Sequence, residues 1–234
     1  MQTATRAIGA QVSEHESLAS LVQESRSRAY SYRLIARLYR REVDQAFLDT
    51  LAHIDTEPMA RDTSQMTRGL IAIVDYARSA GKDDVLVELA VDYARTFIGN
   101  GTNGHEAAYP FESVYLSEKH LMMQAPRDEV RAIYLSAGLD RSEDWSVGED
   151  HMALELEFMG ILADRCADAA EQGEAQEVER LLATQKAFLH NHIAAWGQGL
   201  TTDMRRCART AFYQGTADMT DGFLLADLAY LDEV

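Results

Sequence analysis

Cysteine and proline are both scarce in this 234-residue chain. Its two cysteines, Cys166 and Cys207, belong to no CxxC motif, which argues against a disulfide scaffold and a structural zinc site and fits a reducing compartment. Only three prolines occur, so long stretches contain no helix breaker. The chain has no run of 18 apolar residues and no apolar segment near its N-terminus. We therefore expect a cytoplasmic protein with no membrane-spanning helix and no export signal.

Basic residues are also in deficit: 22 Lys and Arg against 38 Asp and Glu give a formal charge of −16. The acidic excess is concentrated in residues 51–234, which hold 32 acidic and 15 basic residues. Such a surface repels phosphate backbones, which makes nucleic acid and anionic membranes poor partners. A cationic peptide or protein segment is a better partner, although solubility alone explains the same charge.

Helical periodicity, in contrast, runs through the whole chain. The first helix of about six turns is indicated by buried-type residues at steps of three and four: Leu18, Leu21, Val22, Ser25, Ala29, Tyr32, Ile35, Ala36 and Tyr39. Further helices are expected at about 44–54, 63–80, 83–98, 112–124, 127–137, 150–171, 174–197, 201–213 and 216–231. No segment alternates with period two, so strands are not expected. The sequence predicts an all-α fold, a single globular bundle of about nine to ten helices over residues 18–234, after a flexible tail over residues 1–17.

Two stretches interrupt the helical pattern and are the expected loops. The first runs from Gly99 to Pro110 and begins with the sequence GNGTNG. It lacks the GxxxxGK(S/T) pattern, so we interpret its glycines as a helix end and not as a phosphate site. The second runs from Gly138 to Gly148 and permits a hinge over residues 138–150.

His151 and Glu155 are the one pair that suggests metal or acid–base chemistry, because residues four apart share a helix face. A catalytic metal needs about three convergent ligands, and the sequence supplies two. Asp150 also has a structural interpretation as the N-cap of the helix that follows it. That helix is apolar on almost every side over residues 152–162 and is expected to be central and buried. A helical metalloenzyme using His151 and Glu155 stays an alternative, and no cofactor is expected.

Three segments, taken together, resemble those of a known family. They are Asp92–Gly99 (DYARTFIG) continued by Tyr109–Leu116 (YPFESVYL), then Glu149–Met159 (EDHMALELEFM), then a helix with Phe188, His192, Ile193 and Trp196. Over about residues 28–200 their order and spacing resemble the TorD/DmsD family of cytoplasmic redox-enzyme maturation chaperones. The family usually has a proline directly before its Asp-His pair, where this chain has Glu149.

The resemblance implies an all-helical binding protein and not an enzyme. Such a chaperone binds the twin-arginine leader peptide, and also the apo form, of a molybdenum-cofactor oxidoreductase and assists its maturation before export. It is a monomer or a domain-swapped dimer. The peptide-contacting residues implied here are Tyr109, Pro110, Phe111, Glu112, Ser113, Tyr115, Asp150 and His151, and Glu149 and Glu155 join them on charge alone.

Elementary energetics indicate how a leader would be held. Residues 140–157 contain seven acids and one base, Arg141; the acids are Asp140, Glu143, Asp144, Glu149, Asp150, Glu155 and Glu157. An exposed ion pair contributes only ~0.2–1 kcal/mol, whereas burying one large apolar side chain contributes about 1.5–3 kcal/mol. We therefore expect a hydrophobic groove to supply most of the affinity and the acids to set register. Tyr109, Phe111, Tyr115 and Trp145 are candidates to line it, although Phe111 and Tyr115 fit the core equally well.

His151 is expected to have a raised pKa, because Glu149, Asp150 and Glu155 are its neighbours in sequence. A second kind of function also stays open. The chain could be a helical adaptor that docks a folded redox-enzyme subunit through an acidic face.

Overall fold

The computed structural model describes residues 2–79, 85–99 and 107–234, with side chains from residue 18 onward. Within these ranges the chain is helical, and its one β pairing is an isolated bridge between Phe111 and His151. The α-helices are α1 (Gln2–Arg40), α2 (Gln45–Ala52), α3 (Gln65–Arg78), α4 (Val85–Tyr93), α5 (Glu112–Leu116), α6 (Ala125–Ser136), α7 (Met152–Glu171), α8 (Ala175–Phe188), α9 (Ala194–Cys207) and α10 (Ala211–Glu233). A 3₁₀ turn, η1 (Glu57–Met59), and two π-helical segments, η2 (Ala94–Ile98) and η3 (Leu189–Ile193), complete the list.

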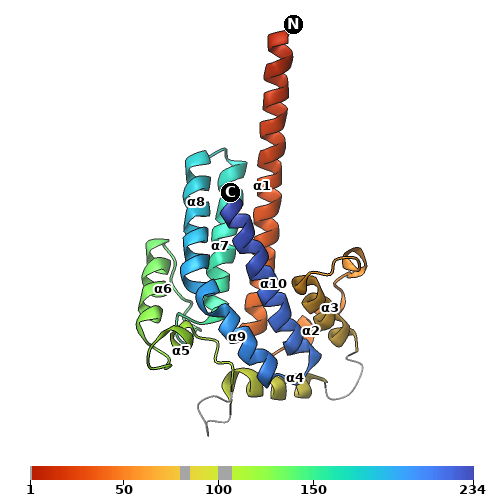
Figure 1. Ribbon diagram of the computed structural model, residues 1–234, viewed down its shortest axis with the longest axis vertical. Helices are drawn as coiled ribbons and strands as arrows, with labels where there is room; N and C mark the ends of the chain where they lie inside the picture. Colours follow the sequence, from red (N-terminus) through yellow and green to blue (C-terminus); the bar gives the residue numbers. More distant parts are fainter. Residues whose placement is uncertain (1, 80–84, 100–106) are drawn as a thin grey trace.

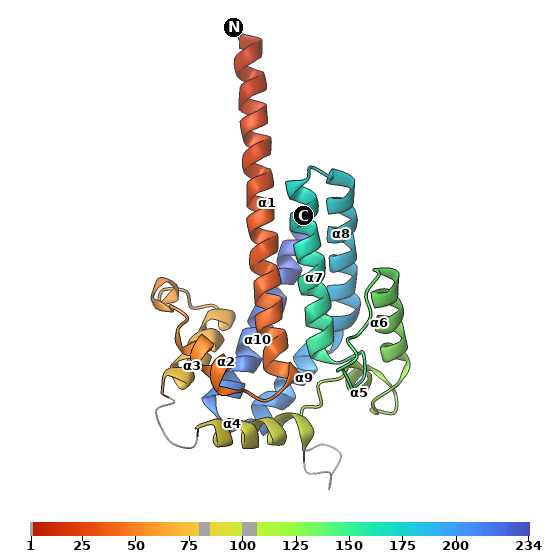
Figure 2. The ribbon, with the colours of Figure 1, turned by 180° about the vertical axis from the view of Figure 1, so that it is seen from behind.

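The predicted all-α fold is confirmed, while a flexible tail over residues 1–17 stays a prediction. Residues 80–84 and 100–106 lie outside the described ranges, and with them most of the GNGTNG segment. Helices α1, α7, α8 and α10 stand side by side in both views, with α1 packed on α7 and α10 packed on α3 (Figures 1 and 2). Helices α4, α5 and α9 lie toward one end of this bundle, and α6 stands beside α8 (Figure 1).

Helix α7 is the predicted central helix. Its apolar residues are buried on several sides, among them Met152, Leu156 and Met159. Gly160 packs on α1, where even a Cβ would be in ordinary van der Waals contact, 3.4 Å from the backbone oxygen of Ala29. The core therefore forms around the α1–α7 contact.

Two of the expected helix boundaries near the C-terminus are wrong, because glycines that resemble breaks are packing positions. The expected break between residues 213 and 216 falls inside α10, where Gly215 faces α3. A Cβ on Gly69 of α3 would lie 2.5 Å from the Gly215 oxygen, so the two backbones meet with no room for side chains. The expected break after residue 197 is also absent: α8, η3 and α9 continue one another to Cys207, and Gly199 packs on Tyr115.

The real break lies between α9 and α10, and Asp92 organises it from α4. The buried Asp92 carboxylate accepts hydrogen bonds from the backbone N–H groups of Arg209 (3.0 Å) and Thr210 (2.7 Å) and from the Thr210 hydroxyl (2.7 Å). Thr210 in turn caps α10 by accepting from Tyr213 N. Asp92 therefore holds the start of the last helix, a contact between residues 118 positions apart.

The helix expected over 112–124 is also shorter than predicted. Helix α5 ends at Leu116, and the backbone then turns through left-handed conformations at His120 (φ 51°) and Met123 (φ 61°), which a helix cannot include. The expected loop over 138–148 is confirmed between α6 and α7.

Replacing Asp92 with Asn should lower the free energy of unfolding by at least about 2 kcal/mol, because an amide cannot accept from all of the buried donors that face it. Urea unfolding followed by circular dichroism measures the loss. Asp75→Asn is the matched control, since the Asp75 side chain on α3 is exposed. Equal midpoints for the two variants would contradict this role.

Candidate functional site

Two of the motif segments, which lie in different loops, pair directly with each other. Residues 109–112 run antiparallel to residues 149–152, with a bridge between Phe111 and His151. The Met152 N–H donates to the Pro110 oxygen at 2.9 Å, and the Glu112 N–H donates to the Asp150 oxygen at 2.9 Å. We call this pairing the strap. It contains seven of the ten predicted site residues. Ser113 directly follows it, and Tyr115 and Glu155 come about one helical turn further on.

Asp150 and His151 cap two different helices. The buried Asp150 carboxylate accepts from Ser113 N at 2.9 Å, so it caps α5 and not α7 as the sequence had indicated. His151 is the N-cap of α7, because its Nδ1 accepts from Ala153 N at 3.0 Å. Gly148 is required beside them, since a Cβ there would lie 2.7 Å from Asp150 Oδ1.

The expected raised pKa of His151 is wrong. Burial lowers the pKa of His151 to about 3, so the ring is neutral. The acids that were expected to stabilise its cation point elsewhere. The ring instead packs edge-on against Phe111 and Trp145, with centroids 4.9 and 5.2 Å away. Because Nδ1 accepts a hydrogen bond, the proton of the neutral ring is on Nε2.

Beneath the strap lies a buried polar cluster, formed by Glu112, Glu155, His192 and Trp196. His192 Nδ1 lies 3.1 Å from Glu112 Oε1, and the Trp196 indole N–H donates to Glu155 Oε2 at 3.0 Å. Burial, and then the nearby carboxyl groups of Glu112 and Asp150, raise the pKa of Glu155 well above its ordinary value. Glu155 Oε1 is buried without a hydrogen-bond partner, which fits a protonated carboxyl better than a carboxylate. Glu112 and Glu155 thus support the strap from inside.

Arginines of the chain itself already neutralise two other predicted acids. Glu149 is buried and pairs with Arg127 (2.5 Å), Arg141 (3.3 Å) and Arg131 (3.7 Å). Burial opposes ionisation, but Arg127 and Arg141 lower the pKa of Glu149. Glu157 pairs with Arg40 at 2.6 Å.

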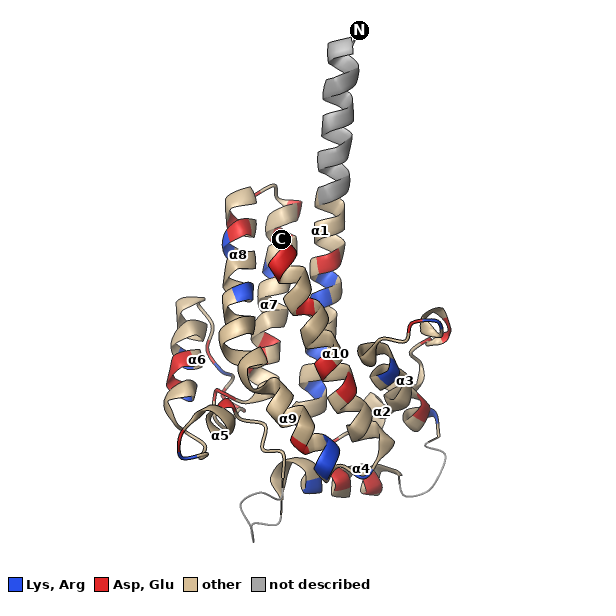
Figure 3. Ribbon diagram, in the orientation of Figure 1, with Lys and Arg blue, Asp and Glu red and all other residues tan. Residues whose placement is uncertain are grey.

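The acidic excess is not by itself a marker of the site, because acidic residues are distributed over most helices (Figure 3). Of the seven acids in residues 140–157, the structure leaves three exposed: Asp140, Glu143 and Asp144.

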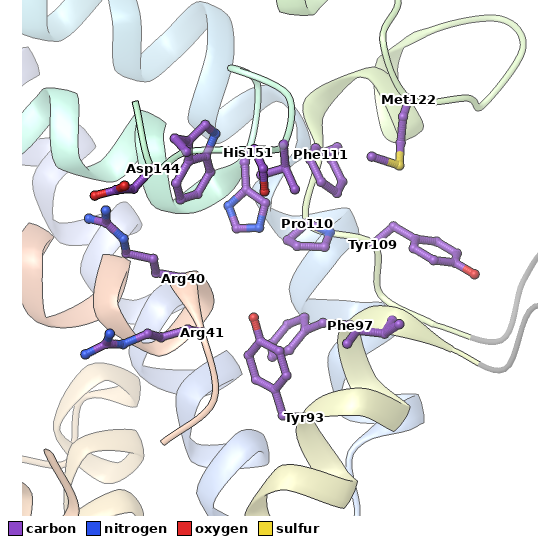
Figure 4. Close-up of a pocket in the computed structure, with 14 residues that line it drawn as sticks. Arg40, Arg41, Tyr93, Phe97, Tyr109, Pro110, Phe111, Met122, Asp144 and His151 are labelled. Atoms are coloured by element: carbon purple, nitrogen blue, oxygen red, sulfur yellow. The ribbon is translucent and has the colours of Figure 1, made fainter. Parts of the chain in front are cut away.

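A cleft of about 680 Å³ opens beside the strap, and we call it the first cleft. In Figure 4 Arg40 and Asp144 lie at one side of it and Tyr109 and Met122 at the other, with His151, Pro110 and Phe111 between them. Tyr93 and Phe97 face them from α4 and η2, and Trp145 also lines the cleft. The π-helical segment η2 matters here, because such segments often occur at functional sites.

A second cleft of about 730 Å³ adjoins the first, and Tyr109 and Met122 line both. Tyr115 lines the second cleft, stacks on Trp196 with ring centroids 5.5 Å apart, and donates to Asp203 at 3.2 Å. Of the four aromatic candidates, Tyr109, Phe111 and Trp145 therefore line the first cleft and Tyr115 the second. Glu112, Ser113, Glu149, Asp150 and Glu155 line neither and support the walls.

Sequence reasoning missed Arg40, Arg41, Tyr93, Phe97 and Met122 as wall residues. They lie at the end of α1 and directly after it, on α4 and η2, and in the segment after α5, and no local sequence signal joins these elements. His192 and Trp196 were noted only as part of a motif.

The alternative metalloenzyme interpretation finds no support in the side-chain geometry. His151 and Glu155 have separate partners, Ala153 N and Trp196. The described residues contain no group of three or more His, Cys, Asp or Glu side chains placed to hold a metal ion.

Over the same residues, no helix is long and apolar enough to cross a membrane.

The raised pKa of Glu155 gives a pH dependence with a definite sign. Between the ordinary value of 4.5 and the folded-state pKa, the unfolded chain is ionised at this position and the folded chain is not, so rising pH weakens folding by at most about 1.4 kcal/mol per pH unit. Glu155→Gln removes this term. We expect the stability of Glu155→Gln relative to the wild type to increase between pH 5 and pH 8, measured by urea unfolding.

Glu143→Gln, an exposed change, is the control and should show no such trend. A Glu155→Gln variant that loses stability against the wild type as the pH rises would show that Glu155 is ionised and stabilising in the fold.

Comparison with known proteins gives a consistent picture. A protein called chaperone protein TorD from Vibrio parahaemolyticus is 23% identical over 208 residues, 87% of this chain and 94% of that protein. Proteins of the same name from Aeromonas salmonicida and Vibrio cholerae are 29% and 27% identical, over 81% and 86% of this chain and 78% and 84% of their own lengths.

The profile of a protein family described as nitrate reductase delta subunit matches residues 56–202, which is more than half of the chain. This range includes the strap, the buried polar cluster, and Tyr109 and Met122, which line both clefts. The resemblance to the TorD-type chaperones is thereby confirmed, and the chain belongs to the nitrate reductase delta subunit family with the TorD-type chaperones.

Proposed function

We propose that this protein is a chaperone for the maturation of a redox enzyme, and that it binds the twin-arginine leader peptide of a molybdenum-cofactor oxidoreductase, and the enzyme's apo form, before export. The observation that carries the proposal is the first cleft. Tyr109, Pro110, Phe111 and His151, residues that the resemblance implied, form one wall of it, and aromatic and apolar side chains make up most of its lining, beside Arg40, Arg41 and Asp144. Sites of this composition and size typically bind ligands through buried apolar contact.

The predicted site residues divide into contacts and supports. Tyr109, Pro110, Phe111 and Trp145 offer apolar surface to the cleft, and the Nε2–H of His151 is one donor available to a peptide carbonyl. The support comes from beneath: Asp150 caps α5, and Glu112 bonds His192. A preformed wall lowers the entropy cost of binding.

In this proposal, apolar and charged groups contribute differently to leader binding. Each large apolar leader side chain buried in the cleft contributes about 1.5–3 kcal/mol, while each exposed ion pair contributes ~0.2–1 kcal/mol. Because Glu149 and Glu157 are paired internally and Asp150 and Glu155 are buried, the leader's arginines would meet Asp140, Glu143 and Asp144. The apolar segment therefore dominates the affinity, and the acids select arginine-containing peptides.

Titration calorimetry with a leader peptide from a candidate client of the same genome tests this function. We expect micromolar or tighter binding that collapses when the apolar segment is deleted and weakens with salt. Val147→Asp should weaken it at least tenfold, because Val147 lines the first cleft.

Leu135→Asp is the matched control, since Leu135 is similarly exposed on α6 and lines no described cleft of the site. No binding of several leaders, combined with binding of a mature client subunit, would replace the leader-peptide function with an adaptor that docks folded protein.

A further inference from the structure

The segment after α5 exposes an unusual amount of apolar surface. Leu116, Leu121, Met122 and Met123 are 41–57% exposed, and they are four of the twelve large apolar side chains that the described part of the chain exposes. We call these four residues the methionine ledge. Contiguous exposed apolar groups mark interaction surfaces, and methionine adapts its shape to varied partners because its side chain is unbranched and flexible.

The backbone of the ledge is held in an uncommon conformation. His120 and Met123 are both left-handed, which is costly for residues other than glycine. Hydrogen bonds fix the turn: His120 Nδ1 lies 2.9 Å from the Val114 oxygen, and Gln124 N donates to Ser113 Oγ at 3.2 Å. The apolar side chains are thus turned outward by a defined structure that is anchored on α5.

The ledge also connects the two clefts. Met122 and Tyr109 are the residues that line both, so one continuous apolar path leads from the first cleft across Met122 into the second. Figure 4 shows Met122 and Tyr109 at the side of the first cleft that lies away from Arg40 and Asp144.

The two ends of this path differ in charge. Asp144 lines the far side of the first cleft and Glu143 precedes it in the sequence; both are exposed, and neither forms an ion pair with a described residue. Arg40 and Arg41 also line this cleft, but they pair with Glu157 and Asp44. In the second cleft the single carboxylate, Asp203, already pairs with Arg206 and accepts from Tyr115. Unpaired acids therefore stand at one end and the methionine ledge at the other.

We infer that the leader lies on this path in one direction, with its arginine pair at Glu143 and Asp144 and its following apolar segment crossing Met122 onto the methionine ledge and into the second cleft. A twin-arginine leader matches this order, because its cationic end precedes its apolar segment. The inference rests on the proposed function and adds to it a second subsite and a direction of binding.

Photo-crosslinking with two leader peptides tests the direction. One peptide carries a benzophenone before its arginine pair and the other carries it at the end of its apolar segment, and digestion with mass spectrometry locates the labelled residues. We expect the first peptide to label residues 140–147 and the second to label residues 116–123. Reversed labelling overturns the direction, and binding without label on residues 116–123 from either peptide overturns the subsite.

Two substitutions test the ledge independently of labelling. Leu121→Glu and Met123→Glu should each weaken binding of the full leader at least tenfold. Leu225→Glu, at an equally exposed position on α10, should leave the affinity unchanged. Equal affinities for all three variants overturn the ledge but leave the proposed function intact, as long as Val147→Asp weakens binding. No binding of any leader to the wild-type protein overturns the proposed function itself, and this inference with it.

Discussion

The pairing of residues 109–112 with residues 149–152 is the constraint on which the rest of the site depends. Two backbone hydrogen bonds, Met152 N to Pro110 O and Glu112 N to Asp150 O, fasten the start of α5 to the start of α7. Since α7 is the buried central helix of the bundle, the strap fixes the cleft wall to the core of the molecule. The aromatic contacts of His151 and the orientation of Phe111 follow from it.

Buried polar groups hold the strap and explain why so many acids surround it. Such groups are destabilising unless they are hydrogen-bonded. Here Ser113 N bonds one oxygen of Asp150, His192 bonds Glu112, and Trp196 bonds one oxygen of Glu155. The π-helical segment η3 supplies His192, so the irregularity in the α8–α9 path has a structural purpose. Charges that resemble a binding patch in the sequence are therefore largely internal connections.

Much of the fold could be predicted from the sequence, because helical periodicity is a local property. The apolar stripe of α1 and the first half of α7, apolar on almost every side, show this, and both are confirmed. The failures arise where a long-range contact decides the outcome. Gly215 suggests a helix break but packs against Gly69 of α3, and Asp92 on α4 sets the real break at Thr210.

In the site, too, local features could be predicted from the sequence and long-range contacts could not. The family motifs alone identified Pro110, Phe111 and His151 as site residues, and all three line the first cleft. Ionisation could not be predicted in this way: neighbours in sequence suggested a cationic His151, but its ring turns toward aromatic groups and is desolvated. Likewise, Arg40 lies more than a hundred residues from Glu157, and only the packing of α1 on α7 reveals that this acid is already paired.

Hydrogen–deuterium exchange of the full-length protein, with and without a saturating leader peptide, tests the central claim most directly. If the leader binds the cleft beside the strap, amides in residues 107–123 and 140–152 gain protection, while those of α3 and α10, which pack on each other away from the strap, do not change. Protection confined to other helices, or none at saturation, would contradict a peptide site beside the strap.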